Sequence, residues 1–168
     1  MPQIHVGVGS NKTFWQAPSA ELVHGAYAAL QCLGTDAVMS PLYRSAAWPD
    51  ATQPPYVNAV VRLSTSLPPQ AVLVALQAIE AAFGRVRFDD PARRYAPRTM
   101  DLDLLDYEGV VQADTALTLP HPAIAQRDFV LLPLRDVTPK WQHPVTGQGI
   151  GAMIEALPLG TAKRLGGG

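Results

Sequence analysis

The chain alternates between segments with strand-like and helix-like arrangements of apolar residues. Short apolar runs at 4–8, 37–43 and 56–63 are typical of buried strands. Between them, apolar residues recur at intervals of three and four over 20–33 and 72–83, which indicates two helices with one apolar face each. The first half of the chain therefore predicts the order strand, helix, strand, strand, helix.

Local signals mark the ends of these two helices. Gly34 follows the first helical stretch and Gly84 follows the second, and glycine is the common residue just past a helix end. Pro68 and Pro69 suit the first turn of a helix. We therefore expect Ser66, just before them, to cap the second helix.

The second half of the chain predicts one more long strand and two further helices. Residues 85–88 have the pattern of a brief extended piece, and 100–107 has the pattern of a strand that ends at a Glu-Gly turn. Mostly apolar helical patterns follow at 124–136 and 150–157. Residues 160–168 are rich in glycine, and we expect them to be loose.

This order of elements predicts an α+β fold in which a mostly antiparallel sheet carries helices on one side. A chain of 168 residues suffices for one domain with its own core. We find no repeat or linker that would divide it, so we expect a single domain at 1–159 followed by a flexible tail at 160–168. The polar loops at 44–55 and 89–97 are functional candidates, because long ordered loops in small domains often carry function.

Composition excludes several classes of protein. Apolar residues make up 48% and charged residues 16% of the chain, which is typical of a globular protein. The net charge of −1 provides no global field that would attract nucleic acid. The single cysteine, Cys32, excludes an internal disulfide, and its helical pattern predicts a small core residue. No stretch has the length and apolar character of a membrane span or secretion signal, so we expect a cytoplasmic protein.

Two aspartates one residue apart, Asp101 and Asp103, stand in the expected strand at 100–107. In a strand, residues i and i+2 lie roughly 6.5 Å apart on one face, so both carboxylates project together while Leu102 and Leu104 face a core. Adjacent carboxylates repel each other unless a cation lies between them, and carboxylate oxygens suit Mg²⁺. The alternative interpretation is a solvated strand face.

Arginine is concentrated just before this acid pair. The chain has ten arginines and three lysines, which a GC-rich coding bias would explain, but that bias does not explain why five arginines fall within residues 85–98. Guanidinium groups form paired hydrogen bonds with phosphate oxygens, so acids for a metal and arginines for phosphates suggest a metal–nucleotide site. Structural ion pairing with nearby aspartates is the alternative. The five residues are Arg85, Arg87, Arg93, Arg94 and Arg98.

Other candidate residues are less specific. Tyr56 and Asn58 share one strand face, where a ring and an amide would bind a flat heterocycle, although core packing explains them equally well. Phe129 has the same two interpretations, and His121, between two prolines, is a nucleotide ligand or a structural histidine. Asp106 lies on the parity opposite to the acid pair, and we expect a turn or surface acid there. The other histidines show no ligand spacing and no partner: His5, His24 and His143.

One longer motif points to a known family. Residues 96–105, Ala-Pro-Arg-Thr-Met-Asp-Leu-Asp-Leu-Leu, closely resemble the defining motif of the 6-hydroxymethyl-7,8-dihydropterin pyrophosphokinases. The resemblance covers roughly residues 3–157, and its Arg-x-x-Asp-x-Asp core is specific. A Gly-Ser-Asn turn at 9–11 also matches, although alone it is neither a Walker A loop nor a dinucleotide-binding motif. Further pieces follow in the family's order at 43–45, 55–59, 84–87, 120–122 and 127–129.

The resemblance implies a ferredoxin-like α+β fold and a reaction. Enzymes of this family transfer pyrophosphate from ATP to the hydroxymethyl group of the pterin and release AMP. The resemblance implies two Mg²⁺ ions held by Asp101 and Asp103, with Arg85 and Arg98 as further catalytic residues. ATP contacts are implied for Gln77, Glu80, Arg87, Tyr95, Arg98, Leu104, Thr118, His121 and Arg127.

The same resemblance implies a pterin site. Tyr56 and Phe129 would sandwich the pterin ring, and Asn58 would hydrogen-bond its edge. Groups around Ser45 and Ala46 would complete this pocket.

Two loops match segments of the family that close over the substrates and exclude water, at 44–55 and 85–97. This chain departs from the family there: Tyr95-Ala96 replaces a common Trp-Gly pair, and 45–49 departs from a common Thr-x-Pro. Ala116 stands where some members have a basic residue. None of these changes touches the acid pair, so we expect activity to survive.

Two other functions are compatible with the residues. A ferredoxin-like nucleic-acid-binding module would need exposed strand aromatics and a basic sheet, and the acid pair would repel its phosphate backbone. A catalytically silent relative would bind ligands for regulation, although the acids and arginines are intact. We expect ATP and the pterin alcohol as partners, with no nucleic acid or membrane, and a monomer.

Overall fold

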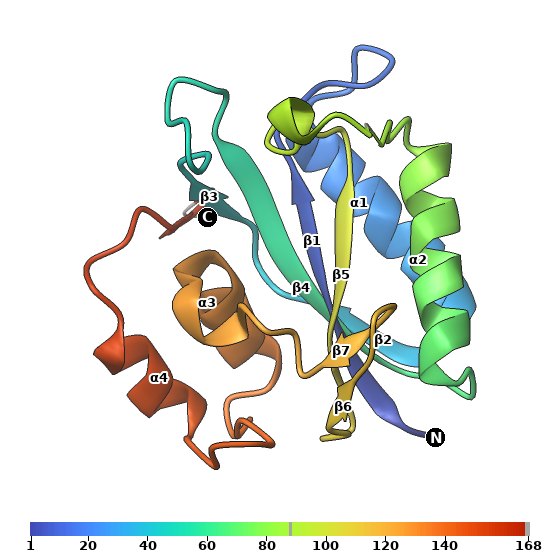
Figure 1. The fold of residues 1–168 in the computed structure, drawn as a ribbon, viewed down its shortest axis with the longest axis vertical. Coiled ribbons are helices and arrows are strands. Elements are labelled where there is room, and N and C mark those ends of the chain that lie inside the picture. Colours follow the sequence, from blue (N-terminus) through green and yellow to red (C-terminus); the bar gives the residue numbers. More distant parts are fainter. Residues whose placement is uncertain (88, 167–168) are drawn as a thin grey trace.

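One antiparallel sheet forms the centre of the fold, with β1 (Gln3–Ser10) and β4 (Tyr56–Ser64) as its middle strands (Figure 1). The computed structural model describes residues 1–87 and 89–166. The other strands of the sheet are β2 (Thr35–Met39), β3 (Tyr43–Ser45), β5 (Asp101–Tyr107) and β8 (Lys163–Arg164). Their order is β5-β1-β4-β3-β8, with β2 also paired to β4. Every strand pairing within the described residues is antiparallel.

Helices cover both faces of this sheet. One face carries α1 (Ser19–Leu30) and α2 (Pro69–Ala82), and the other carries α3 (Asp128–Val137) and α4 (Ile150–Ala156) (Figure 1). The expected antiparallel sheet with packed helices is confirmed, but the expectation of helices on one side is wrong. An apolar helix stripe suits either face, so the pattern could not assign one. Short elements complete the described chain: η1 (Gln31–Leu33), η2 (Pro91–Arg93), η3 (Ile124–Gln126), β6 (Gln112–Ala113) and β7 (Thr118–Leu119).

Alternation along β1 gives the two sheet faces different roles. Ile4, Val6 and Val8 are buried in the core with α1 and α2. Gly7 and Gly9 alternate with them and therefore face the α3 side. A Cβ atom at Gly9 would lie 3.3 Å from Oδ1 of Asn58, so glycine allows the side chains of β4 to lie close against β1.

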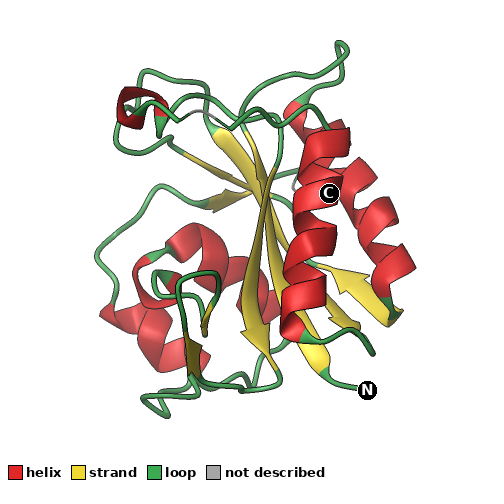
Figure 2. Ribbon diagram, turned by 45° about the vertical axis from the view of Figure 1, so that its right-hand side comes forward, coloured by secondary structure: helices red, strands yellow, loops and turns green. Residues whose placement is uncertain are grey.

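Antiparallel pairing brings the long loops to one end of the sheet. β1 ends where its neighbours β4 and β5 begin, because Gly9 pairs with both Asn58 and Asp101. The loops at 11–18 and 46–55, and the segment that precedes β5, therefore lie at this same end (Figures 1 and 2).

A β-bulge in β5 changes which of its side chains face α3. His5 pairs with Asp106, but the register shifts at the next residue of β1, which leaves Leu105 as an extra residue. Leu105 packs in the core beside α3, and Asp106 accepts a hydrogen bond from the indole of Trp141 at 3.3 Å on that side. Asp106 also accepts from the amide of the turn residue Gly109, but it is buried. The bond to Gly109 fits the expected turn acid, whereas the expected surface position is wrong, because Asp106 is buried beside Trp141 and His5.

His5 is part of the same buried group. Its Nε2 lies 2.8 Å from Oγ1 of Thr138, and its Nδ1 lies 3.4 Å from Oδ2 of Asp106. The expectation that His5 has no partner is wrong, because Thr138 is 133 positions away in the sequence.

Several predicted elements differ in detail. The expected strand at 37–43 is divided into β2 and β3 around Pro41, which has no N–H to donate. The expected helix at 124–136 is divided into η3 and α3. Ser66 does not cap α2, whose first residue follows Pro68 without a side-chain cap. Cys32 is exposed because it lies in η1, beyond the buried stripe of α1.

The segment expected to be a loose tail is attached to the sheet as far as it is described. β8 pairs with β3, and the amide of Leu165 donates to the carbonyl of Leu42 at 2.8 Å. The glycine-rich composition did not reveal this partner strand, and the looseness expected for the tail stays a prediction. Residues 167–168, and Phe88 of the expected extended piece, lie outside the described residues. No helix in the described ranges is both long and apolar enough to cross a membrane.

Candidate active site

The acid pair lies at the beginning of β5, on the face of the sheet that carries α3. Asp101 and Asp103 pair in register with the two glycines of β1, so both carboxylates point to one face, as predicted. Leu102 and Leu104 point the other way and are buried in the core with α2. The carboxylate side chains are 25% and 36% exposed, respectively. The pair is therefore accessible to a cation from solvent.

Two arginines neutralise Asp101. Nη1 of Arg85 lies 3.2 Å from Oδ1 of Asp101, and Nη1 of Arg98 lies 3.2 Å from Oδ2. Arg85 also donates to the backbone oxygen of Met100 at 2.9 Å, which fixes it against the start of β5. The ion pairing that the sequence left as an alternative is thus present for these two arginines.

Asp103 stands in a different electrostatic environment. Burial and the negative charge of Asp101 raise the pKa of Asp103 from 3.8 to about 7. An acid whose ionised form is this strongly disfavoured is a candidate for a site that takes up a cation. The pair therefore combines a carboxylate with two arginine partners and one whose negative charge Arg127 and Arg98 compensate only in part.

His121 presents a neutral imidazole to this acid. Nδ1 of His121 accepts the amide N–H of Ala123 at 3.1 Å, so in the neutral ring the proton lies on Nε2. Nε2 lies 4.0 Å from Oδ1 of Asp103. Burial, followed by the positive charge of Arg127, lowers the pKa of His121 from 6.5. His121 is therefore a neutral hydrogen-bond donor beside the acid pair.

Glu80 connects α2 to both the arginines and the acid strand. Its buried carboxylate accepts from Nη2 of Arg87 at 2.6 Å and from the backbone amide of Leu102 at 3.0 Å. Nη1 of Arg85 lies 3.4 Å from the same carboxylate. Glu80 therefore holds two arginines at the edge of β5, whereas its implied ATP contact stays a prediction.

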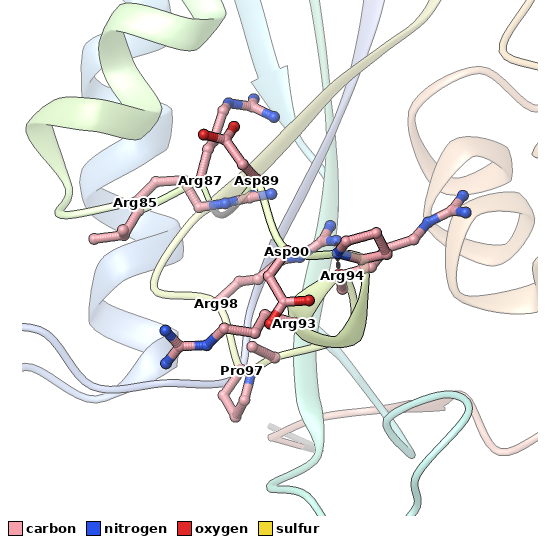
Figure 3. A pocket seen from close by; sticks show the side chains of 11 residues that line it. Arg85, Arg87, Asp89, Asp90, Arg93, Arg94, Pro97 and Arg98 are labelled. Atoms are coloured by element: carbon pink, nitrogen blue, oxygen red, sulfur yellow. Dashed lines mark hydrogen bonds between the residues drawn. The ribbon is translucent and has the colours of Figure 1, made fainter.

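The five clustered arginines line one hollow of about 290 Å³. Their guanidinium groups are spread along this hollow and do not meet at a single point (Figure 3). Asp89 and Asp90 also line it, and Oδ1 of Asp90 accepts the amide N–H of Ala92 at 2.9 Å. Several guanidinium groups along one hollow suit a polyphosphate with several anionic groups. The five arginines are Arg85, Arg87, Arg93, Arg94 and Arg98.

Asn11 holds the two segments that enter β4 and β5. Oδ1 of Asn11 accepts the amide N–H of Arg98 at 2.8 Å, and its Nδ2 donates to the carbonyl of Pro54 at 3.1 Å. Its backbone amide also donates to the carbonyl of Arg98 at 3.0 Å. Sequence reasoning recognised the Gly-Ser-Asn turn but missed this role. The available signal was an amide side chain directly after a buried strand.

The residues expected to bind the pterin come from adjacent strands. Tyr56 pairs in register with Ser45, and Nδ2 of Asn58 donates to Oγ of Ser45 at 2.8 Å. Burial raises the pKa of Tyr56. A Cβ atom at Gly9, which pairs with Asp101, would lie 3.5 Å from the Tyr56 ring and 3.3 Å from Oδ1 of Asn58, so Tyr56 and Asn58 lie across β1 from the acid pair.

Phe129 lies at the start of α3, in the helical layer on the same face of the sheet as the acid pair, and its contact with the pterin stays a prediction. It is half-buried in the first turn of α3, which packs against β3 and β4. The guanidinium carbon of Arg127 lies 5.6 Å from the centre of its ring. An implied ATP contact and an implied pterin contact are thus neighbours at the start of α3.

The two loops expected to close over substrates already contact each other. The rings of Trp48 and Tyr95 meet edge to face with 5.3 Å between their centres. Nε2 of Gln53 donates to the backbone oxygen of Tyr95 at 2.9 Å. The exposed Tyr95 therefore links the loop before β4 to the loop before β5.

Comparison with known proteins adds an independent observation. A sequence model of the family described as 7,8-dihydro-6-hydroxymethylpterin-pyrophosphokinase (HPPK) matches residues 5–139. The chain belongs to this family.

Relatives within the HPPK family match most of the chain. The 2-amino-4-hydroxy-6-hydroxymethyldihydropteridine pyrophosphokinase of Synechocystis sp. is 37% identical over 170 residues, covering 96% of this chain and 83% of the relative. The enzyme of the same name from Pseudomonas aeruginosa is 36% identical and covers 98% of both chains. These names describe ATP-dependent transferases, and this chain is such an enzyme.

Solved structures of HPPK-DHPS chains share the fold. One such structure in complex with substrates has a TM-score of 0.70 at 11% identity, covering 93% of this chain and 45% of that chain. The wild-type Plasmodium falciparum HPPK-DHPS with pteroate has a TM-score of 0.68 at 13% identity, covering 92% and 42%. The chain thus spans less than half of these longer proteins, and the ferredoxin-like fold expected from the sequence is confirmed.

Three implied ATP contacts of this HPPK chain differ in how far their side chains are exposed. Gln77 is exposed on α2, and Thr118 is half-buried in β7. The side chain of Leu104 is buried in the core with α1 and α2, which leaves only its backbone for a nucleotide. These three roles stay predictions.

Proposed function

We propose that this chain transfers pyrophosphate from ATP to 6-hydroxymethyl-7,8-dihydropterin and releases AMP, in folate biosynthesis. Membership of the HPPK family supports the reaction class. One structural observation carries the proposal. The acid pair on β5 has arginines of the hollow on one side and, across the glycines of β1, Asn58 on the other. A polyphosphate and a flat heterocycle would therefore meet beside the two carboxylates.

The proposed reaction exchanges one phosphorus–oxygen bond for another. The hydroxymethyl oxygen of the pterin attacks the β-phosphorus of ATP and loses its proton. The bond from the β-phosphorus to the oxygen that bridges it to the α-phosphorus breaks, and AMP leaves with that oxygen. Attack at the γ-phosphorus would instead release ADP, so the nucleotide product distinguishes the two reactions.

Asp101 and Asp103 fit divalent cations, and we propose that they hold two Mg²⁺ ions. The raised pKa of Asp103 and the shared face of the two carboxylates support this assignment. No group of three His, Cys, Asp or Glu in the described ranges is placed to hold a metal. Phosphate oxygens and water would therefore provide the remaining ligands, as is usual for Mg²⁺. Bound Mg²⁺ would supply neutralisation of phosphate charge.

The arginines and His121 would hold the triphosphate. Arg85 and Arg98 already direct their Nη1 atoms at Asp101, so phosphate oxygens beside that carboxylate would lie within their reach. The neutral His121 would donate its Nε2–H to a phosphate oxygen. Arg87 and Arg127 would add further contacts. These residues keep the reacting phosphorus in place while charge moves to the leaving AMP.

The pterin would occupy the side of the site formed by β4, β3 and the start of α3. Tyr56 and Phe129 would stack on its ring, and Asn58 would bind its edge. The hydrogen bond from Asn58 to Ser45 fixes the amide so that its oxygen remains available as an acceptor. Contact between Trp48 and Tyr95 would help to exclude water from this site.

The product of turnover tests the proposal. Purified protein is incubated with ATP, Mg²⁺ and the reduced pterin alcohol, and nucleotides are separated by chromatography. We expect AMP to accumulate in equal amount to the pterin diphosphate, with no AMP when the pterin is omitted. ADP as the only nucleotide product, or no turnover by folded protein, would contradict the proposal and favour an ordinary kinase or a silent relative.

A further inference from the structure

Residues 160–165 form a strap that runs from the layer of α4 back to the sheet and pairs with β3 (Figure 1). Arg164 pairs with Tyr43 and Lys163 with Arg44. The amide of Leu165 extends this pairing to the carbonyl of Leu42 at 2.8 Å. β3 pairs with β4 along one edge, and the strap pairs with its other edge, which would otherwise be open. Its position is therefore built into the sheet.

The strap also contacts both sides of the proposed pterin site. Oγ1 of Thr161 accepts the amide N–H of Ala46 at 3.1 Å, on the Ser45–Ala46 side. The amide of Ala162 donates to Oδ2 of Asp128 at 3.0 Å, on the α3 side. Oδ1 of the same carboxylate accepts the amide N–H of Phe129 at 2.8 Å. One short segment thus joins the loop after β3 to Asp128, whose carboxylate also accepts the backbone amide of Phe129.

Gly160 sets the closeness of this contact. A Cβ atom at position 160 would lie 1.8 Å from Oδ2 of Asp128, which is far too close for two atoms that are not bonded to each other. The carboxylate would have to rotate away, and it would then lose its bonds to Ala162 and Phe129. Glycine at 160 therefore allows the strap to lie against the start of α3 while Asp128 keeps these two hydrogen bonds.

We propose that the strap sets the separation between the Ser45–Ala46 side and the Phe129 side of the pterin site. Thr161 and Gly160 are then positioning residues for pterin binding, because they act through Ala46 and Asp128 and do not touch the ring. This inference rests on the proposed function, since it takes these two sides as the pterin pocket. The side-chain hydrogen bonds of the strap reach Ala46 and Asp128, and neither residue lines the arginine hollow. ATP binding should therefore not depend on the strap.

Two substitutions test the strap. Thr161→Val removes the acceptor for Ala46 while it keeps the side-chain shape, and Gly160→Ala displaces the Asp128 carboxylate. We expect each variant to raise KM for the pterin alcohol by about fivefold, the scale of one lost hydrogen bond, with kcat and KM for ATP unchanged. Thr146→Val is the matched control, because it removes a hydroxyl that accepts an amide in a distant turn. Gly151→Ala is the control for Gly160→Ala, because a Cβ atom there meets nothing within 4 Å.

The outcomes separate this inference from the proposed function. If wild-type protein releases AMP but both variants keep the wild-type KM for the pterin, the strap has no positioning role. A parallel rise in both KM values, or a loss of kcat shared with the controls, would also overturn it. If the wild type itself fails to use the pterin, the proposed function fails. Hydrogen exchange at the Ala46 amide then decides the strap: faster exchange in Thr161→Val than in Thr146→Val supports it, and equal exchange overturns it.

Discussion

At the level of single residues, neighbouring positions of one strand have different electrostatic environments. Asp101 has a guanidinium group 3.2 Å from each of its carboxylate oxygens. Asp103, two residues later, has a pKa raised to about 7 by burial and by the charge of Asp101. The difference arises because Arg98 and Arg85 approach β5 at its first residue. The two acids of the pair therefore differ in their charged neighbours, although they lie on one face of one strand.

Removal of either carboxylate tests the metal assignment. Asp101→Ala and Asp103→Ala should each lower kcat by roughly a thousandfold, since each would remove a ligand that places charge at the transferred group. Circular dichroism and thermal unfolding should show a folded protein, because both side chains are partly exposed. Asp36→Ala, a change of an exposed acid in β2, is the control. A near-normal rate in either variant would show that the carboxylate holds no essential metal.

The raised pKa of Asp103 also predicts a pH dependence of stability without magnesium. The pKa is about 7 in the fold against 3.8 in the unfolded chain, so folding takes up a proton between these values. The contribution of Asp103 to the free energy of unfolding of the wild type is therefore largest below about pH 4. It falls as the pH rises to about 7 and does not change further above that pH. Asp103→Asn cannot titrate and lacks this loss.

Denaturant unfolding at several pH values measures this effect. The free energy of unfolding of Asp103→Asn relative to wild type should rise between pH 5 and pH 7 and then level off. Asp36→Asn, which changes an exposed acid outside the site in the same way, is measured in parallel as the control. If the relative stability is flat or falls over this pH range, burial and Asp101 do not raise the pKa of Asp103 in the folded protein.

At the level of elements, the site is organised by the end of β1. Its neighbours β4 and β5 both begin there, because both run antiparallel to it. Asn11, the first residue past β1, then joins the segments that enter those two strands. The same antiparallel geometry brings Tyr56 and Asp101 to one end of the sheet. Thus a short turn controls where the proposed ATP and pterin groups stand relative to each other.

Substitution of Asn11 tests this control. Asn11→Ala would leave the partly buried amide of Arg98 and the carbonyl of Pro54 without their side-chain partner, so we expect the free energy of unfolding to fall by about 2 kcal/mol. Asn11→Asp keeps the acceptor for Arg98 and loses the donor to Pro54, so it should show a smaller loss. Urea unfolding provides both values. Unchanged stability in Asn11→Ala would show that the turn does not hold the two segments.

At the level of the whole molecule, two helical layers contribute different parts of the site. The helices α1 and α2 pack on the face of β5 opposite to the acid pair, and α2 contributes Glu80. The layer of α3 contributes Arg127 and Phe129. A buried polar group of His5, Asp106 and its neighbours joins the sheet to the α3 layer at the opposite end from the loops. The layer that carries Phe129 is therefore also attached to the sheet by polar contacts far from the acid pair.

Local sequence alone determined the acid pair, the arginine cluster and most helices and strands. The shared face of Asp101 and Asp103 follows from the two-residue period of a strand, and the apolar stripe of α2 follows from the 3.6-residue period of a helix. The arginines are neighbours in the sequence and so remain neighbours around one hollow. Each of these features depends only on residues within about one element, which is why pattern and spacing suffice.

Tertiary structure decided the features whose partners are distant in sequence. Asn11 meets Arg98 across 87 positions and His5 meets Thr138 across 133, so no local pattern could pair them. The bulge at Leu105 places Asp106 beside Trp141 and His5, partners that no local pattern around the turn could reveal. The strap at 160–165 likewise depends on an open strand edge that exists only once the sheet has formed. Local geometry thus specifies the elements, while long-range pairing of backbone and buried polar groups specifies which elements share a site.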